Sequence, residues 1–242
     1  MNLTNFFYSL VLVNKANKAV SLLGSAFPIT ANGDLLTCRH VVDVISNEEL
    51  HMAVFDYENA KFCKIEKAQI KYHQDPKVDL AFIINPFGDP KPQFFPILSP
   101  NKLLTGEDVY TYGKYALGGR IEEITGGYFS GRIINIYNDK TRELFLLTLP
   151  YPIIEGLSGS PVLTYHNGPK LVGICIGNQA QRILASEVLE YKDTEKEYKE
   201  TINRIVEFGL AIHCSHIIEF LGQMNLKGFI VSDQSVPIVG ME

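Results

Sequence analysis

The residues best suited to chemistry lie between Glu155 and Val162, in the order Glu-Gly-Leu-Ser-Gly-Ser-Pro-Val. Ser158 stands between two glycines, which can adopt tight-turn conformations that a Cβ would obstruct. Backbone amides freed by such a turn can point together at a developing negative charge. The stretch therefore indicates a serine nucleophile with its own anion-binding amides. An ordinary turn between strands carries the same residue types, so this stretch alone leaves both interpretations open.

Two further stretches offer the partners that a serine nucleophile needs. His40 follows a strand-like run that ends at Thr37, and Asp79 heads a long apolar run. Because both neighbours of Asp79 are apolar, we expect its carboxylate to be substantially buried, which is costly without a partner. A histidine can take the serine proton, and an aspartate can fix the tautomer of that histidine. A purely structural role for each of the three residues is the alternative.

In this order and with these flanks, His40, Asp79 and Ser158 resemble the catalytic triad of the trypsin-like (chymotrypsin-fold) serine peptidases. The resemblance covers most of residues 8–222 and is strongest to signal-less bacterial members. It implies an all-β fold of two antiparallel β-barrels, with the active site in the cleft between them and a C-terminal helix. It also implies an oxyanion hole formed by the backbone amides of Gly156 and Ser158.

The resemblance implies a serine endopeptidase that hydrolyses a protein or peptide substrate through an acyl-enzyme intermediate. Two other readings remain open: a catalytically weak or inactive module that binds peptides or partners, and an esterase that uses the same site. Zymogen-type members carry an aspartate before the nucleophile, where this chain has Leu157. Ile176 stands about where the family often has a serine that is hydrogen-bonded to the triad aspartate.

The family's primary specificity pocket is walled by the segment before the nucleophile, the strand after it and a later strand. The matching positions that we expect to bind substrate are Pro152, Glu155, Gly173, Ile176, Gly177 and Ala211. Pro152 occupies the position that is an aspartate in members that cleave after Arg or Lys, and its neighbours are apolar. We therefore expect a small or medium apolar residue at the cleavage position. Glu155, at the pocket mouth, is the one group that would favour a basic side chain.

Other reactive residues fit these roles less well. Cys38 lies two residues from His40, but in this fold the serine turn presents the nucleophile. The run His213-Cys214-Ser215-His216 offers ligands for zinc, but no second cluster completes a tetrahedral set. We interpret these four residues as structural, at the junction of a strand and a helix. The sequence therefore predicts no metal and no other cofactor.

Composition limits the class of protein. The 242 residues are 46% hydrophobic and 20% charged, as in globular proteins, and the net charge is −5. This charge gives no general attraction to nucleic acid or to an anionic membrane, and no run approaches the length of a membrane-spanning helix. The N-terminus lacks a basic region and a cleavage site, so we expect a strand there rather than a signal peptide. Without an export signal, we expect a cytoplasmic protein with four free cysteines. Together with the resemblance to signal-less bacterial members, this implies a bacterial source.

Short strands separated by turn signals run along most of the chain. Five prolines between Pro86 and Pro100 indicate a linker, and we place a boundary inside it. The predicted division is an N-terminal barrel over 1–92 with His40 and Asp79, and a C-terminal barrel with a closing helix over 93–225 with Ser158. Residues 226–242 form a tail without a usable pattern.

The predicted strands cover 8–13, 20–29, 35–37, 52–57, 62–72, 79–84, 107–113, 127–137, 143–149, 160–165, 170–176 and 207–213. The segment 186–206 is dense in Glu and Lys, and we interpret it as a solvated helical insertion where a regulatory protein partner could bind. Ser215 is the predicted N-cap of the closing helix, which we expect to end at about Met224.

Overall fold

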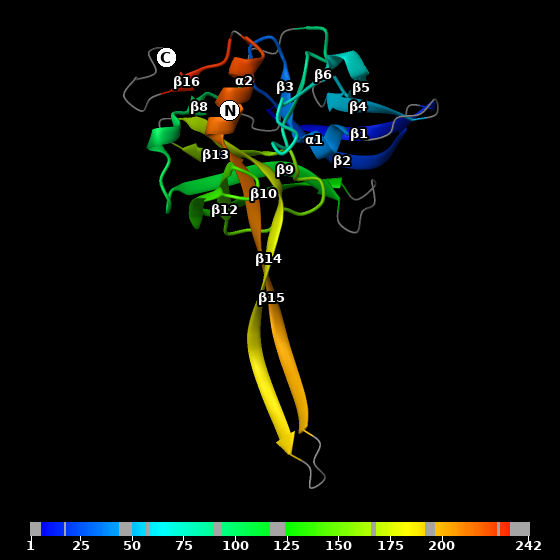
Figure 1. The fold of residues 1–242 in the computed structure, drawn as a ribbon. Coiled ribbons are helices and arrows are strands. Elements are labelled where there is room, and N and C mark those ends of the chain that lie inside the picture. The colour runs from blue at the N-terminus through cyan, green and yellow to red at the C-terminus, as the bar shows by residue number, and fades with distance from the viewer. Residues whose placement is uncertain are drawn as a thin grey trace.

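The computed structural model describes residues 6–16, 18–43, 50–56, 59–89, 93–116, 124–165, 168–191, 197–226 and 228–232. For residues 182–191 and 197–203 the backbone alone is described. Strands make up most of this part of the chain, as Figure 1 shows. The predicted all-β class, with two antiparallel units and a C-terminal helix, is confirmed.

The first seven strands form one antiparallel sheet in the order β5-β4-β1-β2-β3-β7-β6. The predicted strand over 62–72 divides in two, because a 3₁₀ turn at Lys67–Gln69 interrupts it. The short helix α1 (Arg39–Val42) follows β3. The strands are β1 (Tyr8–Asn14), β2 (Ala19–Pro28), β3 (Leu35–Thr37), β4 (Leu50–Asp56), β5 (Lys61–Lys64), β6 (Ile70–Tyr72) and β7 (Ala81–Ile83).

The second sheet has the main order β10-β9-β13-β14-β15-β12-β11, with β8 beside β14 and β16 beside β8. The predicted strand over 127–137 is divided between β10 and β11. A 3₁₀ turn at Pro100–Lys102 follows β8. The strands are β8 (Ile97–Leu98), β9 (Asp108–Ala116), β10 (Ile124–Arg132), β11 (Asn135–Asp139), β12 (Leu144–Leu149), β13 (Pro161–Tyr165), β14 (Pro169–Tyr191), β15 (Glu197–His213) and β16 (Val231–Ser232).

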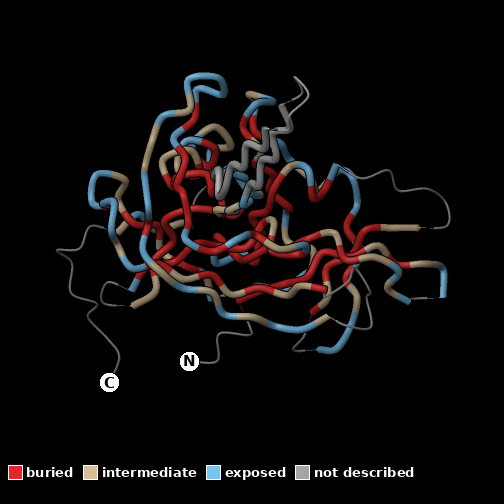
Figure 2. Tube along the Cα trace, turned by 90° about the horizontal axis from the view of Figure 1, so that it is seen from below, coloured by how far each residue is buried: buried red, intermediate tan, exposed pale blue. Residues whose placement is uncertain are grey.

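Strand β9 contacts both units because its side chains alternate between its two faces. Val109, Thr111 and Gly113 are buried on one face, whereas the ring of Tyr112 on the other face lies 4.9 Å from that of Phe7, in a tilted contact. Successive side chains of a strand point to opposite faces, so one strand can serve both the interior of its own unit and the contact with the other unit. Figure 2 shows the buried residues concentrated along the centre of the molecule. The two units therefore share part of their buried interior.

The largest cluster of buried residues crosses from one unit to the other. It includes Phe27 and Phe82 of the first sheet together with Leu146 and Ile212 of the second. The proline-rich linker contributes to this core through Phe87 and Phe95. The boundary at residues 92 and 93 stays a prediction, and Pro90 and Pro92 lie outside the described residues.

The region predicted as a helical insertion at 186–206 is a β-hairpin, so that prediction is wrong. Strands β14 and β15 pair from Gly173↔His213 to Tyr191↔Glu197, with register shifts after Cys175 and after Leu184. Glu and Lys favour helices in isolation, but Ile, Val, Thr and Tyr residues recur along both halves and favour strands. The pairing that begins in the core continues outward along the same two strands. Figure 1 shows the resulting ribbon projecting far from the body.

The closing helix α2 (Cys214–Gln223) agrees with the expected position, but its N-cap is His213, not Ser215. The His213 Nδ1 accepts a hydrogen bond from the backbone amide of Ser215 at 3.2 Å. His216 Nε2 accepts from the backbone amide of Phe145 at 3.0 Å, which ties α2 to β12. Burial lowers the pKa of His213 to about 4. His213 and His216 therefore both make structural hydrogen bonds at this junction.

All four cysteines are buried free thiols, as predicted: Cys38, Cys63, Cys175 and Cys214. Across the described part of the chain, no helix has the length and apolar character required to cross a membrane. Within the segment assigned to the tail, β16 pairs in parallel with β8, and residues 233–242 lie outside the described residues.

Candidate active site

His40 is held by a carboxylate that belongs to a neighbouring strand connection. The backbone amide of His40 donates to Asp79 Oδ1 at 2.9 Å, and its Nδ1 lies 2.6 Å from Asp79 Oδ2. Strands β3 and β7 pair antiparallel, with Thr37 opposite Ala81, so the end of one strand lies beside the beginning of the other. Because a carboxylate only accepts, Nδ1 carries the proton and Nε2 is left as the acceptor.

Asp79 is less buried than its apolar neighbours suggested. The side chain of Asp79 is 28% exposed and that of His40 is 47% exposed, whereas Val78 and Leu80 are buried. The carboxylate therefore reaches from a buried backbone to a partly open surface. Buried Val41 and Val42 anchor α1 in the core and leave His40 at that surface.

Ser158 lies on a turn that requires both of its glycines. Gly156 has φ +98° and Gly159 has φ +86°, in the left-handed region that favours glycine. A Cβ on Gly159 would lie 2.0 Å from the Ser25 carbonyl oxygen, and one on Gly156 would lie 2.7 Å from the Lys114 carbonyl oxygen. The turn therefore has this conformation and packs this closely only because both positions lack a side chain.

The serine turn is bonded to the first unit although it belongs to the second. The Ser25 amide donates to the Ser158 carbonyl at 2.8 Å, and the Ser25 hydroxyl donates to the Gly156 carbonyl at 2.7 Å. A Cβ on Gly24 would lie 2.7 Å from the Ser158 carbonyl oxygen and 2.8 Å from Val41 Cγ2. Ser158 and Val41, the residue after His40, therefore both lie close to Gly24 of β2. Within the described residues, no hydrogen bond joins the Ser158 hydroxyl to His40.

The backbone amides of the turn fall into two groups. Those of Leu157, Gly159 and Ser160 donate to the carbonyls of Ile154, Cys175 and Leu157, at 3.0, 2.8 and 2.9 Å. Those of Gly156 and Ser158 donate to no acceptor among the described residues. These two amides are the ones that the sequence assigns to an oxyanion hole. Both amides can therefore donate a hydrogen bond to an acceptor from outside the chain.

Cys38 lies beneath the histidine and is engaged elsewhere. Its Sγ donates to the Cys175 carbonyl at 3.1 Å, and one ligand atom each of Cys38, His40 and Asp79 lie within 4.8 Å of one another. Such a trio could hold a metal ion, but binding would require a thiolate. Burial, followed by the Asp79 charge, raises the pKa of Cys38 well above its usual range. The arrangement fits a hydrogen-bonded His–Asp pair better than a metal centre.

The six predicted substrate-binding residues are divided among three environments. Pro152 and Glu155 are exposed. Ile176 and Gly177 are partly exposed, at the root of the β14–β15 hairpin. Gly173 and Ala211 are buried inside the second unit, where Ala211 packs in the core and Gly173 lies against the Ile212 carbonyl.

A further residue, Asn178, ties the segment before the serine to the hairpin. Its Oδ1 accepts from the Ile153 amide at 2.6 Å, and its Nδ2 donates to the Ile153 carbonyl at 3.0 Å. The Gly209 amide of β15 also donates to the Tyr151 carbonyl at 3.0 Å. Both strands of the hairpin therefore hold the segment. Asn178 is not among the predicted site residues, because nothing local in the sequence indicates a contact 25 residues away.

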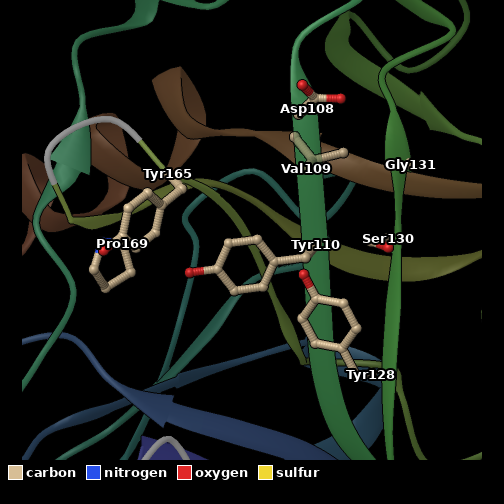
Figure 3. Close-up of a pocket in the computed structure, with 8 residues that line it drawn as sticks. All are labelled: Asp108, Val109, Tyr110, Tyr128, Ser130, Gly131, Tyr165 and Pro169. Atoms are coloured by element: carbon tan, nitrogen blue, oxygen red, sulfur yellow. The ribbon is translucent and has the colours of Figure 1, made fainter. Parts of the chain in front are cut away.

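A cavity of about 630 Å³ lies in the second unit, beside β9, β10 and β13 (Figure 3). The rings of Tyr110 and Tyr128 stack there with centroids 5.5 Å apart. Burial, followed by Tyr128 and Tyr165, raises the pKa of Tyr110 to about 12. None of the predicted site residues lines this cavity, which is formed by Asp108, Val109, Tyr110, Tyr128, Ser130, Gly131, Tyr165 and Pro169.

Comparison with known families identifies the class of the protein. Residues 24–174, more than half of the chain, match the trypsin-like peptidase domain. The chain belongs to this family. The matched region contains His40, Asp79 and Ser158. A search of curated proteins gives no match.

Solved structures share the fold at low sequence identity. One is the apo protease domain of MamO from Magnetospirillum magneticum, with 14% identity and a TM-score of 0.56 over 92% of this chain and 96% of that one. Another is a substituted form of the HtrA-type protease AlgW with a decapeptide. It has 15% identity and a TM-score of 0.58 over 92% of this chain and 65% of that one. These matches confirm the chymotrypsin-like fold.

Proposed function

We propose that the protein is a serine endopeptidase in which Ser158, His40 and Asp79 act as one unit. The observation that carries the proposal is the pair of hydrogen bonds from His40 to Asp79, beside a serine turn that is bonded to β2. Membership of the trypsin-like peptidase domain family supports the same chemistry. The substrate is accordingly a protein or a peptide.

The proposed mechanism assigns each step to an atom. His40 Nε2 takes the proton of the Ser158 hydroxyl, and Oγ attacks the carbonyl carbon of the scissile bond. The negative charge on the former carbonyl oxygen is stabilised by the amides of Gly156 and Ser158. His40 then gives its proton to the leaving amine, and water hydrolyses the acyl-enzyme by the same route. The proposed mechanism requires a hydrogen bond between Ser158 and His40 in the substrate complex, since catalytic hydrogen bonds often form fully only when substrate is bound.

A fluorophosphonate probe tests the proposal directly, because it reacts with an activated serine. Mass spectrometry of the labelled protein should locate the adduct on Ser158, and a peptide library should be cleaved at internal bonds. Hydrolysis of simple esters without peptide cleavage would instead support an esterase.

A module that binds peptides without cleaving them is the second candidate. The lack of a hydrogen bond between Ser158 and His40 in the described residues favours it. Such a module would bind peptides from the library and remain unlabelled by the probe.

We predict that the protein requires no N-terminal trimming for activity. Leu157 directly precedes Ser158 and its apolar side chain is fully buried. This position therefore offers no carboxylate that could pair with a new α-ammonium. Chain that begins at Met1 should react with the probe at the same rate, within about twofold, as chain trimmed before Phe6; twofold corresponds to about 0.4 kcal/mol. Labelling that appears only after trimming would contradict this prediction.

We also predict cleavage after small apolar residues. The Asn178 side chain holds Ile153 against the hairpin, which narrows the space between two walls of the proposed pocket. In Asn178→Ala, cleavage after Leu or Phe should rise about tenfold relative to cleavage after Ala, equivalent to about 1.4 kcal/mol. Profiling of a peptide library measures this ratio, with exposed Asn135→Ala as the matched control.

Glu155 provides the opposing test of specificity. It is exposed beside the serine turn, where its carboxylate could attract a basic side chain. Glu155→Ala should leave the preference for apolar residues unchanged. Dominant cleavage after Arg or Lys by the wild-type protein, lost in Glu155→Ala, would overturn the apolar pocket.

A further inference from the structure

The outer part of the β14–β15 hairpin has no other strand beside it. From Asn178 to Tyr191, β14 pairs with β15 alone among the described strands, and β15 from Glu197 to Phe208 pairs with β14 alone. At the usual rise per residue this ribbon is about 40 Å long. Figure 1 shows it twisting as it leaves the body, with no other element alongside.

A ribbon of two strands is marginally stable by itself in water. Ordering each residue costs about 1–2 kcal/mol of backbone entropy, and a two-stranded ribbon has no interior to offset this cost. The side chains of Gln179, Ala180 and Gln181 are exposed, and Ile205 is 64% exposed. The ribbon therefore has both unpaired backbone groups and apolar surface available to a partner.

The two edges differ in their protection against pairing. Charged residues discourage the addition of a further strand at an edge. From Asn178 to Tyr191, β14 contains three charged residues, Arg182, Glu187 and Glu190. From Glu197 to Phe208, the shorter free part of β15 contains five: Glu197, Lys199, Glu200, Arg204 and Glu207. The open edge is therefore that of β14.

The charges of the hairpin are mixed in sign, so a second copy is not repelled. Between residues 178 and 207 there are five basic and seven acidic side chains. A strongly acidic or strongly basic partner would gain little electrostatic attraction from a surface with charges of both signs. An antiparallel pair of identical strands satisfies every contact twice about a two-fold axis.

We propose that the β14 edges of two copies pair antiparallel and form a four-stranded sheet that makes the protein a dimer. The register that uses the whole free edge places Asn178 opposite Tyr191 of the second copy. It then places Arg182 opposite Glu187 of the second copy, twice in each dimer. The bulge of β14 between Leu184 and Ser186 falls at the two-fold axis, and the charged β15 edges lie outside.

Reversing the charges of Arg182 and Glu187 tests the proposal, with the dissociation constant of the dimer measured by sedimentation equilibrium of the full chain. Arg182→Glu and Glu187→Arg should each raise the dissociation constant of the dimer at least tenfold, because each places like charges opposite one another twice. The combined variant Arg182→Glu/Glu187→Arg should return the constant to within about threefold of wild type. Arg204→Glu, the same charge change on β15, is the matched control and should leave it unchanged.

A cross-link tests the register. In Gln181→Cys/Val188→Cys the two cysteines lie opposite each other between copies, but within one copy they are about 23 Å apart, too far for a disulfide. Mild oxidation should give a covalent dimer on a non-reducing gel, and neither single variant should. The four native cysteines are buried and do not compete.

Three outcomes would overturn the proposal: a wild-type chain that is monomeric at 100 µM, charge variants that the combined change does not rescue, or cross-linking by either single cysteine variant. Circular dichroism of every variant, compared with wild type, separates these outcomes from misfolding. None of the substituted residues belongs to the proposed catalytic site, so the test is independent of the peptidase assignment.

Discussion

Replacing Ser158 with alanine is expected to lower kcat for peptide hydrolysis by about 10⁶-fold. The reason is that the proposed mechanism passes through a covalent bond to Ser158 Oγ, and no other hydroxyl occupies the turn in an equivalent position. Adding His40→Ala to Ser158→Ala should lower the remaining rate by less than about tenfold, because members of a catalytic unit are strongly non-additive. The measurement is the initial rate on a cleaved library peptide, with the binding of that peptide measured in parallel.

The same turn provides the matched control for this prediction. Ser160 lies two residues further on, is fully buried, and its hydroxyl has no hydrogen-bond partner among the described residues. Ser160→Ala should therefore keep kcat within about threefold of wild type, a change of less than 1 kcal/mol in the barrier. Near-wild-type hydrolysis by Ser158→Ala in a preparation free of other peptidases would show that Ser158 is not the nucleophile.

The all-β class and the strand ends that carry His40 and Asp79 could be predicted from sequence because their signals are local. A glycine on each side of Ser158 predicts a turn, and the structure shows why: a Cβ on Gly159 would collide with the Ser25 carbonyl. The flanks of His40 and Asp79 predict the ends of neighbouring strands, and the two side chains are hydrogen-bonded there. Local signals predict short strands and turns, whereas the two-barrel fold and the grouping of His40, Asp79 and Ser158 are what the resemblance to a family implies.

The hairpin could not be predicted because two signals compete within it. Its Glu and Lys residues favour a helix, while its β-branched and aromatic residues favour strands. The outcome depends on β14 and β15 being already paired in the core, from Gly173↔His213 outward. This long-range pairing is not visible in a local window of sequence.

The specificity pocket stays a prediction, and the surroundings of its expected wall residues could not be predicted for a related reason. The sequence places Gly173 and Ala211 near the serine by analogy, but the structure buries both within the second unit. Asn178 contacts Ile153 because the hairpin root passes beside the segment before the serine. Side-chain to backbone contacts of this kind depend on how two loops approach each other in space.

Replacing Asp79 with asparagine is expected to lower kcat by about 10⁴-fold while leaving the fold intact. Asp79 accepts two hydrogen bonds, from the His40 amide at Oδ1 and from the His40 ring at Oδ2. Asparagine has one acceptor oxygen, which the backbone amide of His40 would engage, and its NH₂ group would then face Nδ1. That group can only donate, so Nδ1 must become the acceptor and the ring proton moves to Nε2. A ring with its proton on Nε2 cannot take the proton of Ser158.

The test of this prediction measures kcat, probe labelling and thermal unfolding for Asp79→Asn beside a matched control. Asp75→Asn changes a nearby carboxylate whose Oδ1 accepts from the Lys77 amide in a surface turn, and it should keep kcat within about threefold of wild type, less than 1 kcal/mol in the barrier. Asp79→Asn should unfold at a temperature close to that of wild type, since both groups at this position can hydrogen-bond to His40. Its labelling by the fluorophosphonate should be slowed in proportion to kcat, because both reactions require the same base. Labelling at the wild-type rate would show that His40 acts without Asp79, and unfolding at a much lower temperature would show that the carboxylate serves the fold rather than the tautomer.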